Sequence, residues 1–374
     1  MQTALRAVYV RGGTSRAIVF RQEDLPPAQP PRACSAWDPI FLAALGSPDP
    51  GGRQLNGLGG GISSLSKIAI VGAPTRPDAD VDYTFAQVGV TEPIVSYRGN
   101  CGNISSAIGP FAVDEGLVAT SGHEALVRIH NTNTAKMIEA RFPLVDGRAA
   151  VAGEMTIAGV AGTGAPIRLA FRDPGGATTG RLLPTGNARE VLLLAGGAGV
   201  EVSLVDAANP VVFAAAASFG LRGDETPDAL NADAALLARL EALRVAAAVA
   251  MGLASDAEAR STMKNMPLVA LVAPPRDAEL ADVAVRAISS GQPHRAVPLT
   301  AAMCLAIAAR IPDSIVARCI DPVRAAAGEL RVAHASGVLQ VAATVHLSGG
   351  EVVADEAVVY RTARRLMQGE VLIP

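Results

Sequence analysis

Lys67 is one of two residues whose type and setting could support proton transfer. It follows the glycine- and serine-rich segment 57–66 and precedes the apolar run Ile68–Val71. An amine with the ordinary lysine pKa of about 10.4 is a poor base at neutral pH unless burial or a nearby cation lowers that value. We expect Lys67 to be buried against Ile62 and Leu65 and to act as a general base. The alternative is an exposed lysine at a strand edge, the commoner situation for this residue type.

Cys101 is the second such residue. It lies in the segment 99–103, Gly-Asn-Cys-Gly-Asn, after which apolar residues recur at helical spacing from Ile104 to Ala112. The free N–H groups and the dipole of a helix N-terminus favour a thiolate and bind anions. Cys101 could therefore pass a proton or hold an anionic substrate, or else it is a small buried hydrophobic residue. The remaining cysteines, which we interpret as structural, are Cys34, Cys304 and Cys319.

The elements that must position these residues follow from the apolar pattern. The pattern predicts a hairpin over residues 4–20, a helix over 38–45, a strand at 68–71 and another near 83–90, before the helix that Cys101 begins. Further strands are predicted between 125 and 214. Helices over 229–252, a strand at 267–273, a helix over 300–310 and strands over 330–361 complete the chain.

The order of these elements indicates an internal duplication. Residues 202–213 repeat the strand, turn and strand of residues 8–20, and the spacing from each hairpin to the next apolar helix is similar in the two halves. We therefore expect an α+β protein with two pseudo-symmetric domains, each with strands wrapped around a central helix, and an active site in the cleft between them. The expected domains are residues 1–186, which carry Lys67 and Cys101, and 187–374, whose last strand can return to the first domain.

Composition excludes several classes of protein. The 374 residues carry 32 Lys+Arg against 35 Asp+Glu, a net charge of −3, and only 3% are aromatic, which disfavours nucleic-acid binding. The four cysteines form no CxxC pair and the five histidines show no ligand spacing, so we predict neither a disulfide framework nor a metal site. No signal peptide or membrane span is evident, and we expect a cytoplasmic protein that does not bind membranes.

Several long motifs resemble the PrpF family over nearly the whole chain. That family includes 2-methylaconitate cis-trans isomerase, 4-oxalomesaconate tautomerase and 3-methylitaconate isomerase, and its fold is similar to that of diaminopimelate epimerase. The motifs that carry the resemblance are Arg11-Gly12-Gly13-Thr14-Ser15 and residues 46–50, 63–67, 100–112, 131–134 and 203–213.

The resemblance implies a cofactor-independent isomerase of unsaturated di- or tricarboxylic acids. The family relies on a lysine in a Ser-Lys motif, which matches Lys67, together with a cysteine that matches Cys101. In the similar epimerases a second cysteine begins the other central helix, and here Pro298 stands at that place, which disfavours racemisation by two thiols. The expected partners are a small polycarboxylate substrate, a second copy in a homodimer, and a functional link to a methylcitrate- or aconitate-type dehydratase.

A polycarboxylate requires many hydrogen-bond donors, which glycine turns, helix N-termini and hydroxyl groups can supply. Arg295 could grip a carboxylate with two hydrogen bonds, or it is an ordinary solvated arginine. We interpret Asp206 and Asn209 as turn-capping residues. The expected substrate-binding residues are Ser15, Arg16, Ser63, Ser64, Ser66, Gly102, Asn103, Ile104 and Ser105 in the first half, and His294, Arg295, Thr300 and Ser336 in the second.

Two other functions stay open at this point. One is an epimerase or racemase of an amino or hydroxy acid, as in the similar fold. The other is a non-catalytic protein that stabilises a dehydratase or carries a small acid.

Overall fold

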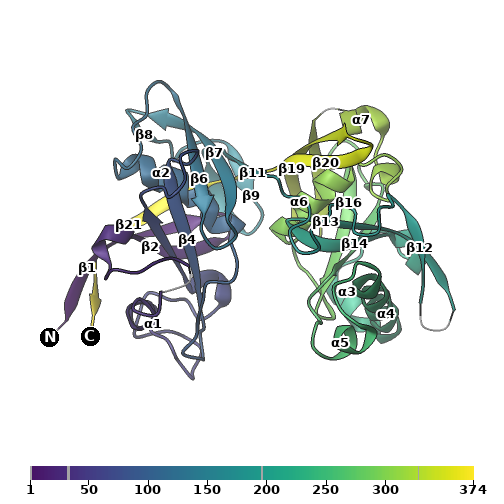
Figure 1. Ribbon diagram of the computed structural model, residues 1–374, viewed down its shortest axis with the longest axis horizontal. Coiled ribbons are helices and arrows are strands. Elements are labelled where there is room, and N and C mark those ends of the chain that lie inside the picture. Colours follow the sequence, from purple (N-terminus) through teal and green to yellow (C-terminus); the bar gives the residue numbers. More distant parts are fainter. Residues whose placement is uncertain (1, 32–33, 195–196, 327) are drawn as a thin grey trace. The chain divides into compact units, whose positions relative to one another are not determined.

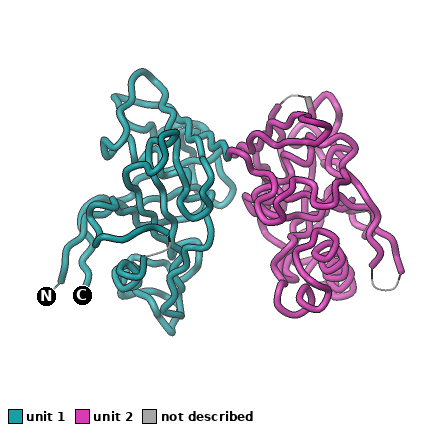
Figure 2. The backbone as a smooth tube through the Cα atoms, viewed as in Figure 1, with its two compact units in different colours: residues 1–171, 360–374 teal, residues 172–359 magenta. Residues whose placement is uncertain are grey.

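The protein is described by a computed structural model that covers residues 2–31, 34–194, 197–326 and 328–374. The chain divides into two compact units (Figure 2). Unit 1 comprises residues 1–171 and 360–374, and unit 2 comprises residues 172–359. The sequence placed the division after residue 186, whereas the contacts within each unit place it after Phe171.

Residues 173–182 join unit 2 because they are hydrogen-bonded to Asp206. The Asp206 carboxylate accepts hydrogen bonds from the backbone N–H groups of Thr178 and Thr179, at 2.8 and 2.6 Å. The backbone of Asp206 accepts from the N–H of Gly176 and donates to the carbonyl of Leu182. Asp206 is fully buried, so these bonds tie the segment to the second unit.

Unit 1 wraps its strands around helix α2 (Gly102–Asp114) (Figure 1). The strands pair in the order β21-β1-β2-β3-β4-β6-β7-β11, and α2 contacts strands from both ends of this order. Nine residues of α2 are buried, which explains its apolar sequence. The strands of this unit are β1 (Thr3–Gly12), β2 (Ser15–Arg21), β3 (Lys67–Gly72), β4 (Val81–Val88), β5 (Val95–Ser96), β6 (Glu124–Asn131), β7 (Lys136–Val145), β8 (Arg148–Ala149), β9 (Met155–Ile157), β10 (Val160–Gly164), β11 (Ile167–Arg172) and β21 (Ala363–Ile373).

A second helix covers the outside of these strands. Helix α1 (Asp38–Leu45) begins with Pro39 in its first turn and ends at Gly46, which takes the left-handed conformation with φ 73°. Its Phe41 ring stacks on Phe20 of β2, with ring centroids 5.8 Å apart. Short 3-10 turns occur at η1 (Gln22–Asp24) and η2 (Ser63–Leu65).

Unit 2 repeats this arrangement around helix α6 (Leu299–Ala308), which Pro298 begins as N-cap. The strands pair in the order β12-β13-β14-β15-β16-β18-β19-β20. They are β12 (Glu190–Leu193), β13 (Gly199–Ala207), β14 (Asn209–Ala215), β15 (Leu268–Ala273), β16 (Val283–Ser289), β17 (Gln292–Pro293), β18 (Glu329–His334), β19 (Gly337–Ser348) and β20 (Glu351–Arg361). The other helices are α3 (Pro227–Ala232), α4 (Ala234–Ala250), α5 (Asp256–Ser261) and α7 (Pro322–Ala326), with 3-10 turns η3 (Ala216–Phe219) and η4 (Ala317–Cys319).

An aspartate–arginine pair occurs at the same place in each unit and shows which residues of the two units correspond. The N–H of Asp80 donates to the carbonyl of Arg128, and the N–H and guanidinium of Arg128 donate to the Asp80 carboxylate, where β4 begins to pair with β6 in parallel. Asp282 and Arg331 form the same set of bonds where β16 begins to pair with β18. The strand-by-strand match from β1 to β7 and from β13 to β19 confirms the expectation of two α+β units of similar topology.

No helix among the described residues is long and apolar enough to span a membrane.

Candidate active site

Lys67 is the first residue of β3, and its side chain is buried although it carries an amine. It is only 8% exposed. Its Nζ lies 5.1 Å from the centroid of the Phe85 ring and donates a hydrogen bond of 2.5 Å to Oε1 of Gln87. Ile62, which we expected to help bury the lysine, is 56% exposed, so the neighbouring strand β4 provides the cover instead.

Strand β4 connects the surroundings of Lys67 with those of Cys101. Tyr83, Phe85 and Gln87 alternate along β4 and therefore share one face of the strand. Gln87 and Phe85 contact Lys67, whereas Tyr83, at the other end of this row, is fully buried near Cys101. Burial raises the pKa of Tyr83 well above its usual value, and its electrostatic interaction with Cys101 adds to the rise.

Cys101 is the N-cap of α2 and is partly exposed. Its carbonyl accepts the first helical hydrogen bond from the N–H of Ser105, at 2.9 Å. The amide of Ser105 is therefore used within the helix, and the N–H groups that can face an anion are those of Gly102, Asn103 and Ile104.

The Gly12-Gly13 turn lies directly against this helix N-terminus. A Cβ on Gly12 would lie 2.5 Å from the carbonyl oxygen of Asn103, and a Cβ on Gly13 would lie 2.3 Å from its Oδ1. The Asn103 side chain also donates a hydrogen bond of 3.1 Å to Oγ1 of Thr14. Only glycines permit this approach, which explains the Gly-Gly pair in the first motif.

Arg361 was not among the residues expected from the sequence. It ends β20, is 7% exposed, and donates a hydrogen bond of 3.0 Å from Nε to Oδ1 of Asn103. Its Nη1 donates to the carbonyl of Tyr360, and no partner for Nη2 occurs within the described part of the chain. Burial lowers the pKa of Arg361 to about 10, while its electrostatic interaction with Cys101 opposes this shift, so the guanidinium stays charged at neutral pH.

Gln87 was also not among the residues expected from the sequence, because a glutamine in a strand has no reactive group that would distinguish it. It could have been found from its position, since it is the cross-strand partner of Lys67. Arg361 carries a weaker signal, because it is a charged residue that directly follows the segment 357–360, Ala-Val-Val-Tyr.

The substrate-binding residues expected in the first half of the sequence differ in burial and in contacts. Ser15 is buried in the turn, and the Arg16 guanidinium lies over the Tyr9 ring at 5.5 Å from its centroid. Ser63 is exposed and Ser64 partly exposed. Ser66 is fully buried and its hydroxyl accepts a hydrogen bond from Gln54, so it supports the loop.

The expected second-half residues lie near the start of α6 in unit 2. His294 is partly buried, its Nε2 has no hydrogen-bond partner within the described chain, and burial lowers its pKa. Arg295 is exposed and paired with Asp228, as in the alternative of a solvated arginine. Thr300 lies in the first turn of α6, and exposed Ser336 donates a hydrogen bond to the carbonyl of Arg295. The structure thus groups each half's residues within its own unit.

The remaining cysteines, unlike Cys101, are not at the N-terminus of a central helix. Cys34 is buried at 3% exposure. Cys304 is fully buried in α6 with its thiol on the carbonyl of Val205, and burial raises its pKa strongly. Burial also raises the pKa of Cys319.

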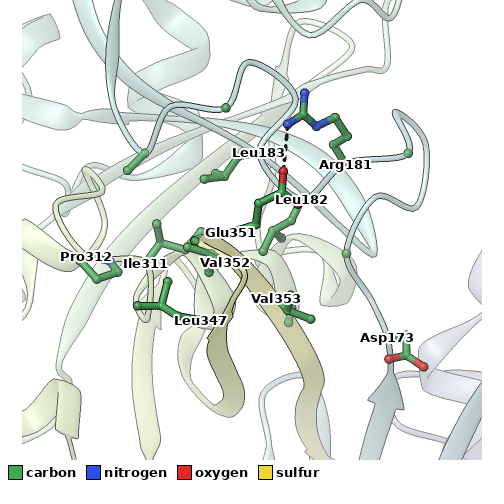
Figure 3. Close-up of a pocket in the computed structure, with 16 residues that line it drawn as sticks. Asp173, Arg181, Leu182, Leu183, Ile311, Pro312, Leu347, Glu351, Val352 and Val353 are labelled. Carbon is green, nitrogen blue, oxygen red and sulfur yellow. Dashed lines mark hydrogen bonds and ion pairs between the residues drawn. The ribbon is translucent and has the colours of Figure 1, made fainter.

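A cavity of about 530 Å³ in unit 2 contains none of these residues (Figure 3). It is lined mainly by apolar side chains, including Ile311, Leu347 and Val353, and the exposed ion pair of Arg181 with Glu351 lies at its edge. Its lining contains no lysine, histidine or cysteine, and its titratable side chains are those of Asp173, Arg181 and Glu351. Among the described residues no cluster of His, Cys, Asp or Glu is suited to hold a metal ion.

Comparison with known proteins gives relatives over the full length. The chain is 41% identical to the 3-methylitaconate isomerase of Eubacterium barkeri, covering 100% of this chain and 98% of the relative. It is 37% identical to the 2-methyl-aconitate isomerase of Cupriavidus necator, covering 100% and 98%. It is 39% identical to the (4E)-oxalomesaconate Delta-isomerase of a Novosphingobium species, covering 98% and 96%.

Solved structures agree with these relatives. The crystal structure of methylitaconate-delta-isomerase superimposes with a TM-score of 0.91 at 40% identity, covering 100% of this chain and 96% of that one. A hydroxyproline epimerase from Agrobacterium vitis matches with a TM-score of 0.53 at 9% identity, covering 99% and 92%, which shows the fold alone. The fold is thus the diaminopimelate epimerase-like fold that the sequence predicted. With the PrpF protein family model matching residues 2–374 as well, the chain belongs to the PrpF family and is an isomerase.

Proposed function

We propose that the protein is a cofactor-independent isomerase of a branched unsaturated di- or tricarboxylic acid. In this proposal Lys67 is the base, Cys101 assists, and the double bond shifts or rotates as a proton leaves one carbon and returns. The observation that carries the proposal is the shared face of β4, where Gln87 and Phe85 contact Lys67 and Tyr83 lies near Cys101.

The names of the relatives support the substrate class. They concern 3-methylitaconate, 2-methylaconitate and oxalomesaconate, which all combine a carbon–carbon double bond with several carboxylates. The free N–H groups at the start of α2 and the charged guanidinium of Arg361 suit one such carboxylate. A molecule with two or three carboxylates would thereby be held with its allylic carbon beside the amine and the thiol.

The chemistry requires no electron transfer. A base takes a proton from the carbon next to the double bond, and the electron pair spreads over the allylic system and the adjacent carboxyl group. A proton then adds at the other end of the allylic system, and the double bond has moved. Since the reaction is reversible, the group that removes a proton in one direction returns one in the other.

Exchange of substrate protons with solvent tests this proposal. Purified protein in deuterated water with each of the three acids should introduce deuterium at the allylic carbon of at least one of them, and dialysis against a chelator should not change the rate. Lys67→Ala and Cys101→Ser should each lower the rate by at least about 100-fold, the lower range for a proton-transfer group. Lys264→Ala, which alters an exposed lysine of unit 2, is the matched control.

The same variants separate the other two functions. A binding or accessory protein would bind the acids without exchange in the wild type, and Lys67→Ala would retain its function. Loss of optical rotation in an amino or hydroxy acid would support an epimerase, although Pro298 caps α6 where Cys101 caps α2. Folded protein that exchanges no proton in any of the three acids would contradict the proposal.

A further inference from the structure

Building on the proposed function, we infer that Gln87 is the positioning residue that fixes the amine of Lys67 and raises its affinity for a proton. Lys67 acts as the base once its own proton has gone to solvent, and Gln87 then stabilises the ammonium ion that forms when the amine takes a proton from the substrate.

The amide of Gln87 can present only its oxygen to Lys67. Its Nε2 donates hydrogen bonds to the carbonyls of Ser63 and Ser66, at 3.1 and 2.9 Å, and lies 3.4 Å from the carbonyl of Val88. A carbonyl oxygen accepts only from a donor, so these contacts fix which end of the amide faces away from the amine. Oε1 therefore lies 2.5 Å from Nζ and accepts its hydrogen bond.

Both groups that contact Nζ stabilise a positive charge. A hydrogen bond to an acceptor is stronger when the donor is charged, and an aromatic ring attracts a cation over its face. The Gln87 oxygen and the Phe85 ring provide these two interactions, and the burial of Lys67 limits the water that could replace them.

Neither contact neutralises the charge. Within the described chain Lys67 has no carboxylate partner, and both Gln87 and Phe85 are uncharged. An ammonium ion held in this way keeps its full charge for an anionic substrate, whereas an aspartate or glutamate at position 87 would compete with the carboxylates of that substrate.

The second unit supports a shared role for the three residues. Asp80 in unit 1 and Asp282 in unit 2 hold equivalent places, so residues at the same distance after each aspartate correspond to one another. Phe85 therefore corresponds to Ala287, and Gln87 to Ser289. Leu268, which is the first residue of β15 as Lys67 is of β3, occupies the place of the lysine. The amine, the amide and the aromatic ring are thus absent together from the duplicated unit.

The chain has three lysines, Lys67, Lys136 and Lys264, so the titration of each can be followed directly. Protein labelled with 13C at the lysine ε-carbon would be titrated by NMR, with the Lys67 signal assigned as the one missing from Lys67→Arg. In Gln87→Met, which removes the acceptor at similar length, the midpoint for Lys67 should fall by about one pH unit, a tenfold loss of proton affinity. In Gln87→Glu the midpoint should rise instead.

The Lys67 midpoint should thus fall in one variant and rise in the other. Structural damage would instead shift the midpoint in the same direction in both variants. The pH dependence of kcat should shift with the midpoint in each variant. Gln368→Met, which alters an exposed glutamine of unit 1, should change neither property. An unchanged Lys67 midpoint in both Gln87 variants would overturn the inference while leaving the isomerase proposal intact. The titration can be measured even if none of the three acids is a substrate, so the two proposals fail separately.

Discussion

The side chain of Asn133 pairs with the backbone of Phe85 as a neighbouring strand would. Its Oδ1 accepts from the N–H of Phe85 at 2.7 Å, and its Nδ2 donates to the carbonyl of Phe85 at 2.9 Å and to that of Tyr97 at 2.7 Å. The amide fills the interval between the end of β6, which pairs with β4 up to Tyr83, and the start of β5, which pairs with Gln87. Asn133 thereby fixes the backbone of Phe85, whose ring lies against the amine of Lys67.

We expect Asn133→Ala to destabilise the protein by about 2 kcal/mol, because three backbone groups lose their partner in a partly buried place. Urea unfolding would measure this change, and kcat should fall as the Phe85 ring loses its fixed position. Asn133→Asp retains the acceptor for the N–H of Phe85 but sets a carboxylate oxygen against the carbonyls of Phe85 and Tyr97, so its activity should be no higher than that of the alanine variant. Full activity in Asn133→Ala would show that the amide does not help to place the ring.

Much of the fold could be predicted from the sequence because its signals are local. The hairpin of β1 and β2, helix α1, the helix that Cys101 begins and the place of Pro298 all follow from apolar spacing, glycine turns and the internal repeat. The domain boundary does not follow in this way, because residues 173–182 are assigned by hydrogen bonds to Asp206, which lies more than twenty residues further along the chain.

The residues around the candidate active site were predicted unevenly for a similar reason. Lys67 and Cys101 have distinctive side chains in distinctive motifs, whereas Gln87 is recognisable only from its cross-strand pairing with Lys67. Arg361 is separated by 258 residues from Asn103, with which it forms a hydrogen bond. No spacing rule connects two such positions, and the pairing becomes visible only once β20 ends beside the start of α2.

The close approach of the Gly12-Gly13 turn to Asn103 leads to a second prediction. Gly13 has φ +51°, and an added Cβ would lie 2.3 Å from Asn103 Oδ1, so Gly13→Ala combines backbone strain with overlap. We expect a loss of about 3 kcal/mol in the free energy of unfolding, from roughly 1 for the strain and 2 for the overlap. The control is Gly122→Ala, where φ is +86° but no atom lies within 4 Å of the added Cβ, so only the strain should appear. Equal losses in both variants would contradict the predicted overlap.

Cys101 should be the thiol that alkylating reagents modify first. It is partly exposed at a helix N-terminus with the charged Arg361 nearby, while Cys34 and Cys304 are buried and burial raises the pKa of Cys319. Mass spectrometry after brief treatment with iodoacetamide at pH 7 would identify the modified residue.

Arg361→Met should slow this modification on the order of fivefold, equivalent to about 1 kcal/mol of charge interaction near a protein surface. Arg361→Lys retains the charge and should restore most of the rate. If all three proteins react equally fast, Arg361 does not stabilise the thiolate.

His294 should make the stability of unit 2 depend on pH. Burial lowers its pKa in the folded protein, whereas in the unfolded chain the imidazole takes a proton near pH 6.5. The unfolded state therefore binds more protons as the pH falls through 6.5, and the free energy of unfolding decreases until the pH drops below the folded pKa. Urea midpoints between pH 7.5 and 5 should fall less steeply in His294→Gln than in the wild type. His123→Gln, which alters an exposed histidine of unit 1, should follow the wild-type curve. A wild-type slope in His294→Gln would mean that its imidazole is as accessible to protons in the folded protein as in the unfolded chain.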